Sequence, residues 1–202
     1  SIGLILDSTT GHLYYADNFT IFSPNLELVF VRHGETYGNC GQTTADATID
    51  VAKVVNNQKN TNQRIFQGNV DETINQLTND GDKQAMAVEA LLDRQLIKNG
   101  WVPDIIFHSP LSRARDTGLP FVLAHGFQSR YHALEDIREI SFGAWDNRRI
   151  CDFADNDPCH LFYKDQHALV KQDGMNGHGI YAAAESFCEL LLRAHRVMAN
   201  LN

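Results

Sequence analysis

Hydrophobic and polar positions follow one another along this chain in an order that predicts an α/β domain. Leu28 to Val31 form a run of four apolar residues, which is typical of a strand buried on both faces. A second short run, Asp104 to His108, predicts another buried strand. Because helical patterns follow these runs, we expect helices on both faces of a mainly parallel sheet, a three-layer α/β/α sandwich.

Three segments carry the helical part of the pattern. Apolar residues share one face between residues 79 and 99, where Thr78 is a candidate N-cap. Ser109-Pro110 predicts a helix start, with a cap residue and proline at the first helical position, which places Arg113 in the first turn. Apolar positions from 187 to 201 predict a final amphipathic helix.

Two further segments lie outside this core pattern. His12 to Tyr15 and Phe19 to Phe22 predict a small N-terminal β-hairpin. Residues 40–66 are mostly polar and form an insertion. The insertion either shapes the mouth of a pocket and sets specificity, or is a solvated surface excursion, since long loops are tolerated at low cost.

Candidate chemistry appears where the first predicted strand ends. Arg32 and His33 follow its last apolar residue directly, and Gly34 comes next. Ligands of open α/β sheets bind at the carboxyl ends of strands. Gly34 relieves backbone crowding there, and Thr36 can cap a following helix. The segment therefore predicts a site for an anion such as a phosphate.

Four blocks together resemble the signature of the histidine phosphatase superfamily, which includes the phosphoglycerate mutases and many phosphatases. In the family's order they are Arg32 to Thr36 with Asn39, Gln67-Gly68 with Asp71 and Leu77 to Gly81, Phe107 to Thr117, and Arg138 to Asp146. The resemblance spans about residues 27 to 150, with a weaker echo from Glu185-Ser186-Phe187 to Arg193. Chance agreement of all four blocks is very improbable.

This resemblance implies that His33 is the catalytic nucleophile, which attacks a phosphoryl group to form a phosphohistidine. The attacking ring nitrogen must be unprotonated, and the carbonyl of Gly34 is a family-like candidate to accept a hydrogen bond from the other nitrogen. Arg32 and Arg113 are expected to hold the phosphoryl oxygens, because planar guanidinium groups match them bidentately. An arginine clamp can replace a metal, so we expect no cofactor and no metal.

Glu139 is the candidate general acid, which protonates the leaving alcohol and then activates water. Glu135 and Asp136 are rivals, but the frame from Arg138 to Trp145 resembles the family's acid-bearing block and selects Glu139. The uncharged Asn39 and Gln67 resemble family positions that contact the phosphate or the substrate. The predicted partner is thus a small phosphorylated substrate.

Composition and charge are compatible with this interpretation. The 202 residues are 43% hydrophobic and 21% charged, which is ordinary globular usage and enough for one large domain. A formal net charge of −8 disfavours general binding to nucleic acid or to an anionic membrane. A local arginine cluster can still capture an anionic substrate. Nothing in the pattern predicts an oligomeric state.

The expected location is the cytoplasm. Cys40, Cys151, Cys159 and Cys188 form no Cys-x-x-Cys pair, which favours reduced thiols, although two disulfides stay open as an alternative. The chain has neither a run of 18 apolar residues nor a visible signal peptide. Because the sequence begins at Ser1, secretion also stays open.

One feature of the family is missing, namely a second histidine on a later strand. Neither His178 nor His195 follows an apolar strand, so we expect that the sequence stops short of that strand at Asn202. The favoured function is a metal-independent phosphatase, because Phe142 to Trp145 resembles the phosphatase branch. The alternatives are a phosphoglycerate mutase-like phosphotransferase and a non-catalytic module that binds a phospho-ligand or a protein.

Overall fold

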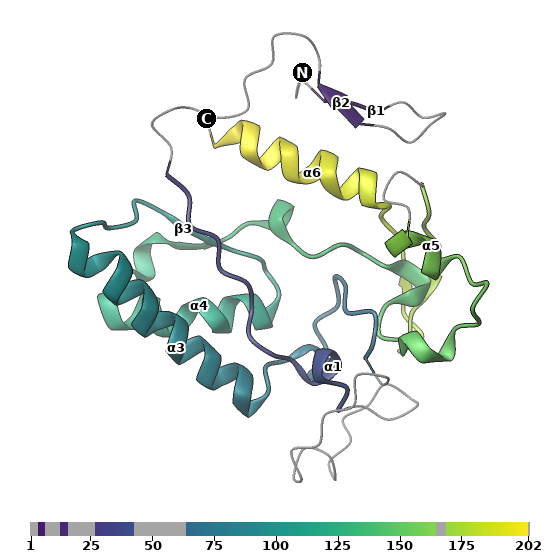
Figure 1. The fold of residues 1–202 in the computed structure, drawn as a ribbon, viewed down its shortest axis with the longest axis horizontal. Helices are drawn as coiled ribbons and strands as arrows, with labels where there is room; N and C mark the ends of the chain where they lie inside the picture. Colours follow the sequence, from purple (N-terminus) through teal and green to yellow (C-terminus); the bar gives the residue numbers. More distant parts are fainter. Residues whose placement is uncertain (1–3, 7–12, 16–26, 43–63, 165–168, 202) are drawn as a thin grey trace.

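The computed structural model describes residues 4–6, 13–15, 27–42, 64–164 and 169–201, which form a mixed α/β architecture. Its α-helices are α1 (Tyr37–Cys40), α3 (Asn79–Gln95), α4 (Ser112–His125), α5 (Cys159–Lys164) and α6 (Phe187–Asn200). Short 3-10 helices are η2 (Thr73–Asn75), η3 (Ile97–Asn99), η4 (Gln128–Arg130), η5 (Glu135–Ile137), η6 (Gly143–Trp145) and η7 (Ile150–Asp152). Figure 1 shows α3 and α4 side by side, with α6 on the opposite side of the molecule.

The strands are short and pair two by two. They are β1 (Leu4–Leu6), β2 (Leu13–Tyr15), β3 (Ile106–His108), β4 (Tyr131–Ala133), β5 (Gly174–Met175) and β6 (Tyr181–Ala182). β3 and β4 are parallel, in a register that places Phe107 opposite His132, whereas β1–β2 and β5–β6 are antiparallel. The strand predicted at residues 19–22 and most of the insertion at residues 40–66 lie outside the described residues. The broad parallel sheet of the predicted three-layer sandwich remains a prediction.

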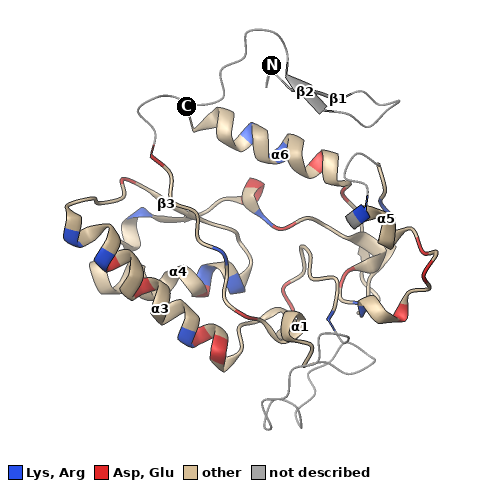
Figure 2. Cartoon of the chain, in the orientation of Figure 1, with Lys and Arg blue, Asp and Glu red and all other residues tan. Residues whose placement is uncertain are grey.

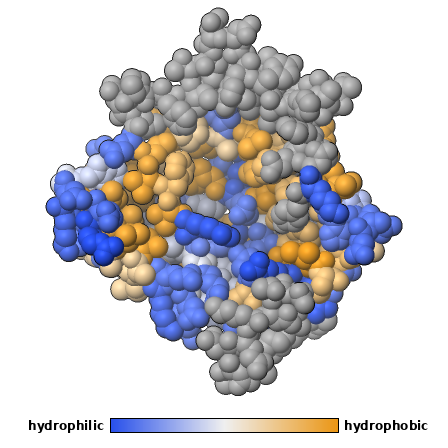
Figure 3. Space-filling model, in the orientation of Figure 1, coloured by the Kyte–Doolittle hydropathy of each residue, from blue (hydrophilic) through white to orange (hydrophobic). Residues whose placement is uncertain are grey.

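The prediction of a buried strand at Leu28 to Val31 is wrong for this structure. These residues have no strand hydrogen bonding, and the exposed fractions of Val29, Phe30 and Val31 are 44%, 82% and 45%. An apolar run becomes a strand only when a neighbouring strand offers hydrogen-bond partners, and none of the described segments pairs with these residues. In Figure 3 apolar side chains accordingly occupy much of the face between the grey segments.

The helix boundaries follow local capping chemistry. Thr78 caps α3 as predicted, since its Oγ1 accepts a hydrogen bond from Gly81 N at 3.0 Å. Figure 2 marks several charged residues along α3, and much of this helix is exposed, as expected for a helix with a solvated face. The predicted start of α4 at Ser109-Pro110 is wrong, because α4 begins at Ser112. The carboxylate of Asp71 accepts hydrogen bonds from both Ser112 N (3.0 Å) and Ser112 Oγ (2.5 Å). Asp71 thus caps the N-terminus of α4 in place of a residue that directly precedes the helix.

The main apolar cluster lies between the loop at residues 64–68 and the segment at residues 140–162. Its buried members are Phe66, Ile140, Phe142, Trp145, Cys159 and Phe162. Backbone hydrogen bonds hold the two segments together, from Phe66 N to Arg148 O (2.9 Å) and from Asn147 N to Phe66 O (2.8 Å). This cluster therefore fixes the position of the short loop that carries Gln67.

The described residues also bear on two expectations about the environment of the chain. None of the four cysteines, all of which lie in the described ranges, forms a disulfide in the structure. Within the described ranges, no helix has both the length and the apolar character needed to cross a membrane.

Two backbones touch where the segment at residues 33–36 crosses the start of α3. A Cβ atom built on Gly34 would lie 2.7 Å from the carbonyl oxygen of Gly81, and one built on Gly81 would overlap the carbonyl oxygen of Glu35. Thr78 N donates to Glu35 O (2.9 Å), and Glu35 N donates to the side chain of Gln84 (2.8 Å). The crowding that the sequence predicts at Gly34 is confirmed, and Gly81 shares it.

We expect Gly81→Ala to destabilise the protein by about 1–3 kcal/mol, because the added methyl group has no room beside Glu35. At an unconstrained helix position the same change stabilises by roughly 0.5–1 kcal/mol, so the sign of the effect is diagnostic. Urea unfolding measures it. Lys83→Ala, two residues further along α3 and exposed, is the matched control and should stay within about 0.5 kcal/mol of the wild type. A stabilised Gly81→Ala variant would contradict the contact.

Candidate active site

A single pocket of about 400 Å³ brings together five of the six residues singled out from the sequence. Arg32, His33, Asn39, Gln67 and Glu139 all line it. The other lining residues are Arg64, Ile65, Ile140, Phe142, Ile150, Phe162, Phe187 and Leu190. Its volume lies within the range of about 300–1,000 Å³ that is typical of small-molecule sites.

His33 is held in one tautomer by its own neighbour. Its Nδ1 lies 2.7 Å from the carbonyl oxygen of Gly34, as predicted, and a carbonyl can only accept a hydrogen bond. Nδ1 therefore carries the proton, and Nε2 keeps its lone pair. Burial lowers the pKa of His33 below its ordinary value of 6.5, and the charges of Arg113 and Arg32 lower it further. The hydrogen bond to Gly34 and the charge of Glu139 oppose this shift.

The backbone that follows His33 is anchored from two helices. Gly34 N donates to Thr117 Oγ1 at 2.9 Å, and this hydroxyl in turn donates to the carbonyl of Arg113 in α4 (2.7 Å). Thr36 is the N-cap of α1, as predicted, and accepts from Asn39 N at 3.3 Å. The position of the imidazole ring is thus set by contacts of its neighbours rather than by its own packing.

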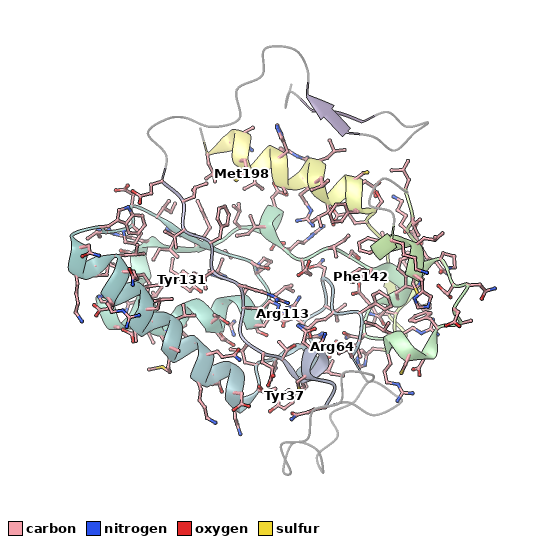
Figure 4. All side chains as sticks on the ribbon, viewed as in Figure 1. Tyr37, Arg64, Arg113, Tyr131, Phe142 and Met198 are labelled. Carbon is pink, nitrogen blue, oxygen red and sulfur yellow. The ribbon has the colours of Figure 1, made fainter. Side chains whose placement is uncertain are left out.

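Arg113 is the predicted site residue that does not line the pocket. Its side chain is only 1% exposed, and it donates to the carbonyls of Gly68 (Nη2, 2.8 Å) and Val70 (Nη1, 3.2 Å). Burial lowers the pKa of its guanidinium, whereas the charges of Glu139, Asp71 and Asp146 raise it. Figure 4 shows Arg113 near the middle of the molecule. Its charge reaches His33, since it lowers the pKa of that ring.

Gln67 presents an amide donor that lacks a partner among the described residues. Thr36 Oγ1 lies 2.7 Å from Gln67 Oε1 and donates to it, since this hydroxyl already accepts from Asn39 N. The Nε2 group of Gln67 is buried and makes no hydrogen bond. A buried donor left unpaired costs about 1–3 kcal/mol, so native structures rarely leave one without a ligand or water to accept from it.

Glu139 lies half-buried in the pocket, and its Oε1 accepts a hydrogen bond from Ile140 N at 3.1 Å. The rivals Glu135 and Asp136 belong to η5, are exposed and do not line the pocket. Among the residues that the structure describes, no group of three or more His, Cys, Asp or Glu side chains is arranged to hold a metal ion.

Sequence reasoning missed Arg64 and the apolar wall opposite the polar residues. Arg64, which Figure 4 labels, comes three residues before Gln67, is exposed and lines the pocket. Phe162 and Phe187, from α5 and α6, bring the wall from segments far along the chain. The one signal for Arg64 in the sequence is its positive charge three positions before Gln67, a predicted site residue. The wall has no local signal, because its apolar residues are the same ones that form core helices.

The two later histidines lie elsewhere. His178 is exposed in the turn between β5 and β6, and His195 is buried within α6. Neither lines the pocket, so His33 is the one histidine at this pocket among the described residues.

Asp146 is a buried carboxylate beneath the pocket that ties its two loops together. Its Oδ1 accepts from Gly68 N (2.9 Å) and its Oδ2 from Phe142 N (3.0 Å). Burial raises its pKa to about 7, although the hydrogen bonds from Phe142, Gly68 and Gly143 and the charge of Arg113 favour the ionised form. The loop with Gln67 and the segment after Glu139 are therefore coupled through one side chain.

These features define the class of site, in which a neutral histidine, arginines and an unpaired amide donor surround a cavity that suits an anion. The chain belongs to the histidine phosphatase superfamily, branch 1, whose family model matches residues 28–202. The order of motifs seen in the sequence is thereby explained.

A curated relative and several solved structures resemble the chain. It is 33% identical over 171 residues to a mannitol-1-phosphatase of Eimeria tenella, which covers 85% of this chain and 48% of the relative. A similar solved structure is the alpha-ribazole phosphatase of Shigella flexneri, at 22% identity, a TM-score of 0.53, and coverage of 85% of this chain and 64% of that one.

A mycobacterial glucosyl-3-phosphoglycerate phosphatase is also similar, at 24% identity, a TM-score of 0.50, and coverage of 68% and 55% of the two chains. At these identities the solved structures show the fold alone. The chain spans about half the length of the curated relative that it matches.

The raised pKa of Asp146 predicts a specific pH dependence of stability. The unfolded chain releases this proton near the ordinary pKa of 3.8 and the folded protein near 7, so the folded state binds more protons in between. Stability should therefore fall as pH rises from about 4 to about 7. Asp146→Asn removes this titration. Urea unfolding at several pH values should show the wild type losing stability relative to that variant across this interval.

The exposed Asp155→Asn is the matched control, and its stability difference from the wild type should stay nearly constant with pH. A flat difference for Asp146→Asn as well would contradict the proton uptake assigned to that carboxylate.

Proposed function

We propose that the protein is a metal-independent phosphatase that hydrolyses a small phosphomonoester through a phosphohistidine on His33. The observation that carries this proposal is the hydrogen bond from His33 Nδ1 to Gly34 O, which leaves Nε2 free in a pocket beside Arg32. A histidine whose pKa is lowered is unprotonated at neutral pH and is ready to act as a nucleophile.

The reaction divides into two displacements. In the first, His33 Nε2 forms a bond to phosphorus while the ester P–O bond breaks, and Glu139 gives its proton to the departing alkoxide. In the second, the Glu139 carboxylate takes a proton from water, whose oxygen attacks phosphorus and breaks the P–N bond. Inorganic phosphate leaves, and both side chains return to their starting states.

The surrounding donors supply stabilisation of charge. Phosphoryl transfer depends mainly on alignment and on groups that stabilise the charge on the transferring oxygens. Arg32, Asn39 and Gln67 line the pocket, and the Nε2 group of Gln67 is a buried donor without a partner among the described residues. Arg113 contributes its positive charge from beneath and holds the Gln67 loop through the carbonyls of Gly68 and Val70.

For the substrate we propose a phosphorylated sugar alcohol or a similar small sugar phosphate. The support is the similarity to the mannitol-1-phosphatase, together with a pocket that has a polar, cationic side and an apolar side. The phosphate would lie against Arg32 and His33. The carbon chain would then extend along Phe142 and Leu190, where C–H groups of a polyol can pack on an apolar surface.

We expect His33→Ala to abolish hydrolysis of mannitol 1-phosphate and of p-nitrophenyl phosphate in the presence of a chelator. When the reaction is quenched at alkaline pH, where phosphohistidine survives, the wild type should yield a phosphoenzyme. The His33→Ala variant, treated in the same way, should yield none. Steady-state kinetics and phosphoenzyme trapping measure the two effects. Equal rates in variant and wild type would refute the nucleophile.

His108→Ala is the matched control for this experiment. The Nδ1 of His108 also lies 2.7 Å from a neighbouring carbonyl, that of Ser109, but the ring packs on Tyr131 and does not line the pocket. This variant should keep most of its activity. Its inactivity would show that loss at His33 has a structural rather than a chemical cause.

Gln67→Met should weaken binding of phosphate by roughly tenfold, because one hydrogen bond to a charged group contributes about 1.5–3 kcal/mol. The measurement is the inhibition constant of inorganic phosphate as a product inhibitor. Gln76→Met, at an exposed position directly after η2, is the control and should leave this constant unchanged. Unchanged phosphate inhibition in Gln67→Met would contradict the role of its Nε2 group.

A further inference from the structure

The guanidinium group of Arg193 lies beneath the backbone that carries Glu139. Arg193 belongs to α6 and is only 6% exposed. Its Nη1 donates to the carbonyls of Asp136 (2.9 Å) and Arg138 (2.8 Å), and its Nη2 lies 3.5 Å from the carbonyl of Glu139. One side chain thus contacts three carbonyls around the candidate acid, more than fifty positions earlier in the sequence.

The opposite edge of this guanidinium is fixed by Glu185. Arg193 Nε and Nη2 donate to the two carboxylate oxygens of Glu185 at 2.8 and 2.7 Å, a bidentate pair in which both side chains are largely shielded from solvent. The hydrogen bonds and charge of Glu185 raise the pKa of Arg193, so the cation persists at any working pH. Glu185 N also donates to Ser141 O at 2.8 Å.

These contacts enclose the segment at residues 136–141 on the side away from the pocket. Arg193 holds the carbonyls before and at Glu139, and the backbone of Glu185 holds the carbonyl two residues after it. The segment has no strand or α-helix of its own over residues 138–141, so its conformation depends on such external bonds. Arg193 itself does not line the pocket and cannot touch a substrate there.

We propose that Arg193 and Glu185 form a positioning pair that sets the orientation of Glu139 as a proton donor to the leaving group. This inference rests on the proposed function. Only arginine suits the position, because its planar fork can reach several carbonyls and a carboxylate at once, whereas a lysine offers one point charge. A misplacement of about 1 Å at a reacting group can lower a rate roughly a hundredfold, so a distant support of this kind affects chemistry.

The leaving group distinguishes positioning of the acid from a general structural role. An alkoxide such as that of mannitol is strongly basic and needs a proton as it departs, whereas p-nitrophenolate departs readily without one. A defect in proton donation therefore lowers kcat/KM for mannitol 1-phosphate much more than for p-nitrophenyl phosphate. Partial unfolding, by contrast, lowers both values by the same factor, because it removes active protein.

The experiment measures kcat/KM on both substrates for the full-length protein and five variants. Glu139→Gln should lower kcat/KM for mannitol 1-phosphate by at least about a hundredfold, and kcat/KM for p-nitrophenyl phosphate much less. Arg193→Met should show the same selectivity at about tenfold or more, with a change below threefold on the aryl ester. Arg193→Lys should recover only part of the loss. Arg196→Met, on the exposed side of α6, is the matched control and should match the wild type on both substrates.

If Arg193→Met fails to fold, Glu185→Gln provides a second test. It weakens the ion pair with Arg193 and keeps the arginine in place. It should show a smaller loss with the same selectivity. Equal losses on both substrates in these variants, or none, would overturn the positioning role while Glu139→Gln keeps its signature. If Glu139→Gln itself shows no selectivity, then the assignment of the acid fails and the positioning pair fails with it.

Discussion

The site depends first on the contact between two peptide backbones at Gly34 and Gly81. His33 donates its Nδ1 proton to the carbonyl of Gly34, so whatever fixes that peptide also fixes the ring and its free nitrogen. The first turn of α3 packs on one side of the peptide, and Thr117 of α4 accepts its N–H group. No side chain fits between these backbones, which is why glycine occupies both positions.

Buried charges organise the floor beneath the pocket. Arg113 and Asp146 are both shielded from water, a state that is costly unless hydrogen bonds satisfy each group. Here the guanidinium is satisfied by the carbonyls of Gly68 and Val70, and the carboxylate by the amides of Gly68 and Phe142. The peptide of Gly68 is therefore held from both sides, and the adjacent Gln67 lines the pocket with a buried Nε2 group that lacks a partner among the described residues.

The pocket combines short loops with helices that come from distant parts of the chain. The polar side is built from the segments at residues 32–39 and 64–67, and the apolar side from α5, α6 and the segment at residues 140–150. The lining therefore has a polar side with positive charges and an apolar side. Arg193 of α6 contacts the backbone around Glu139, although Arg193 itself does not line the pocket.

The sequence alone predicted the candidate site residues and the local signals, because motifs, caps and apolar periodicity depend on neighbours within a few positions. It predicted the cap at Thr78, the crowding at Gly34, the final helix and five residues that share one pocket. Tertiary structure decided the rest. Leu28 to Val31 lack strand hydrogen bonds because strand pairing needs a partner, and α4 starts at Ser112 because Asp71 supplies its cap. Likewise Arg113 lies beneath the pocket and Arg193 beneath Glu139, since both positions depend on carbonyls brought from far along the chain.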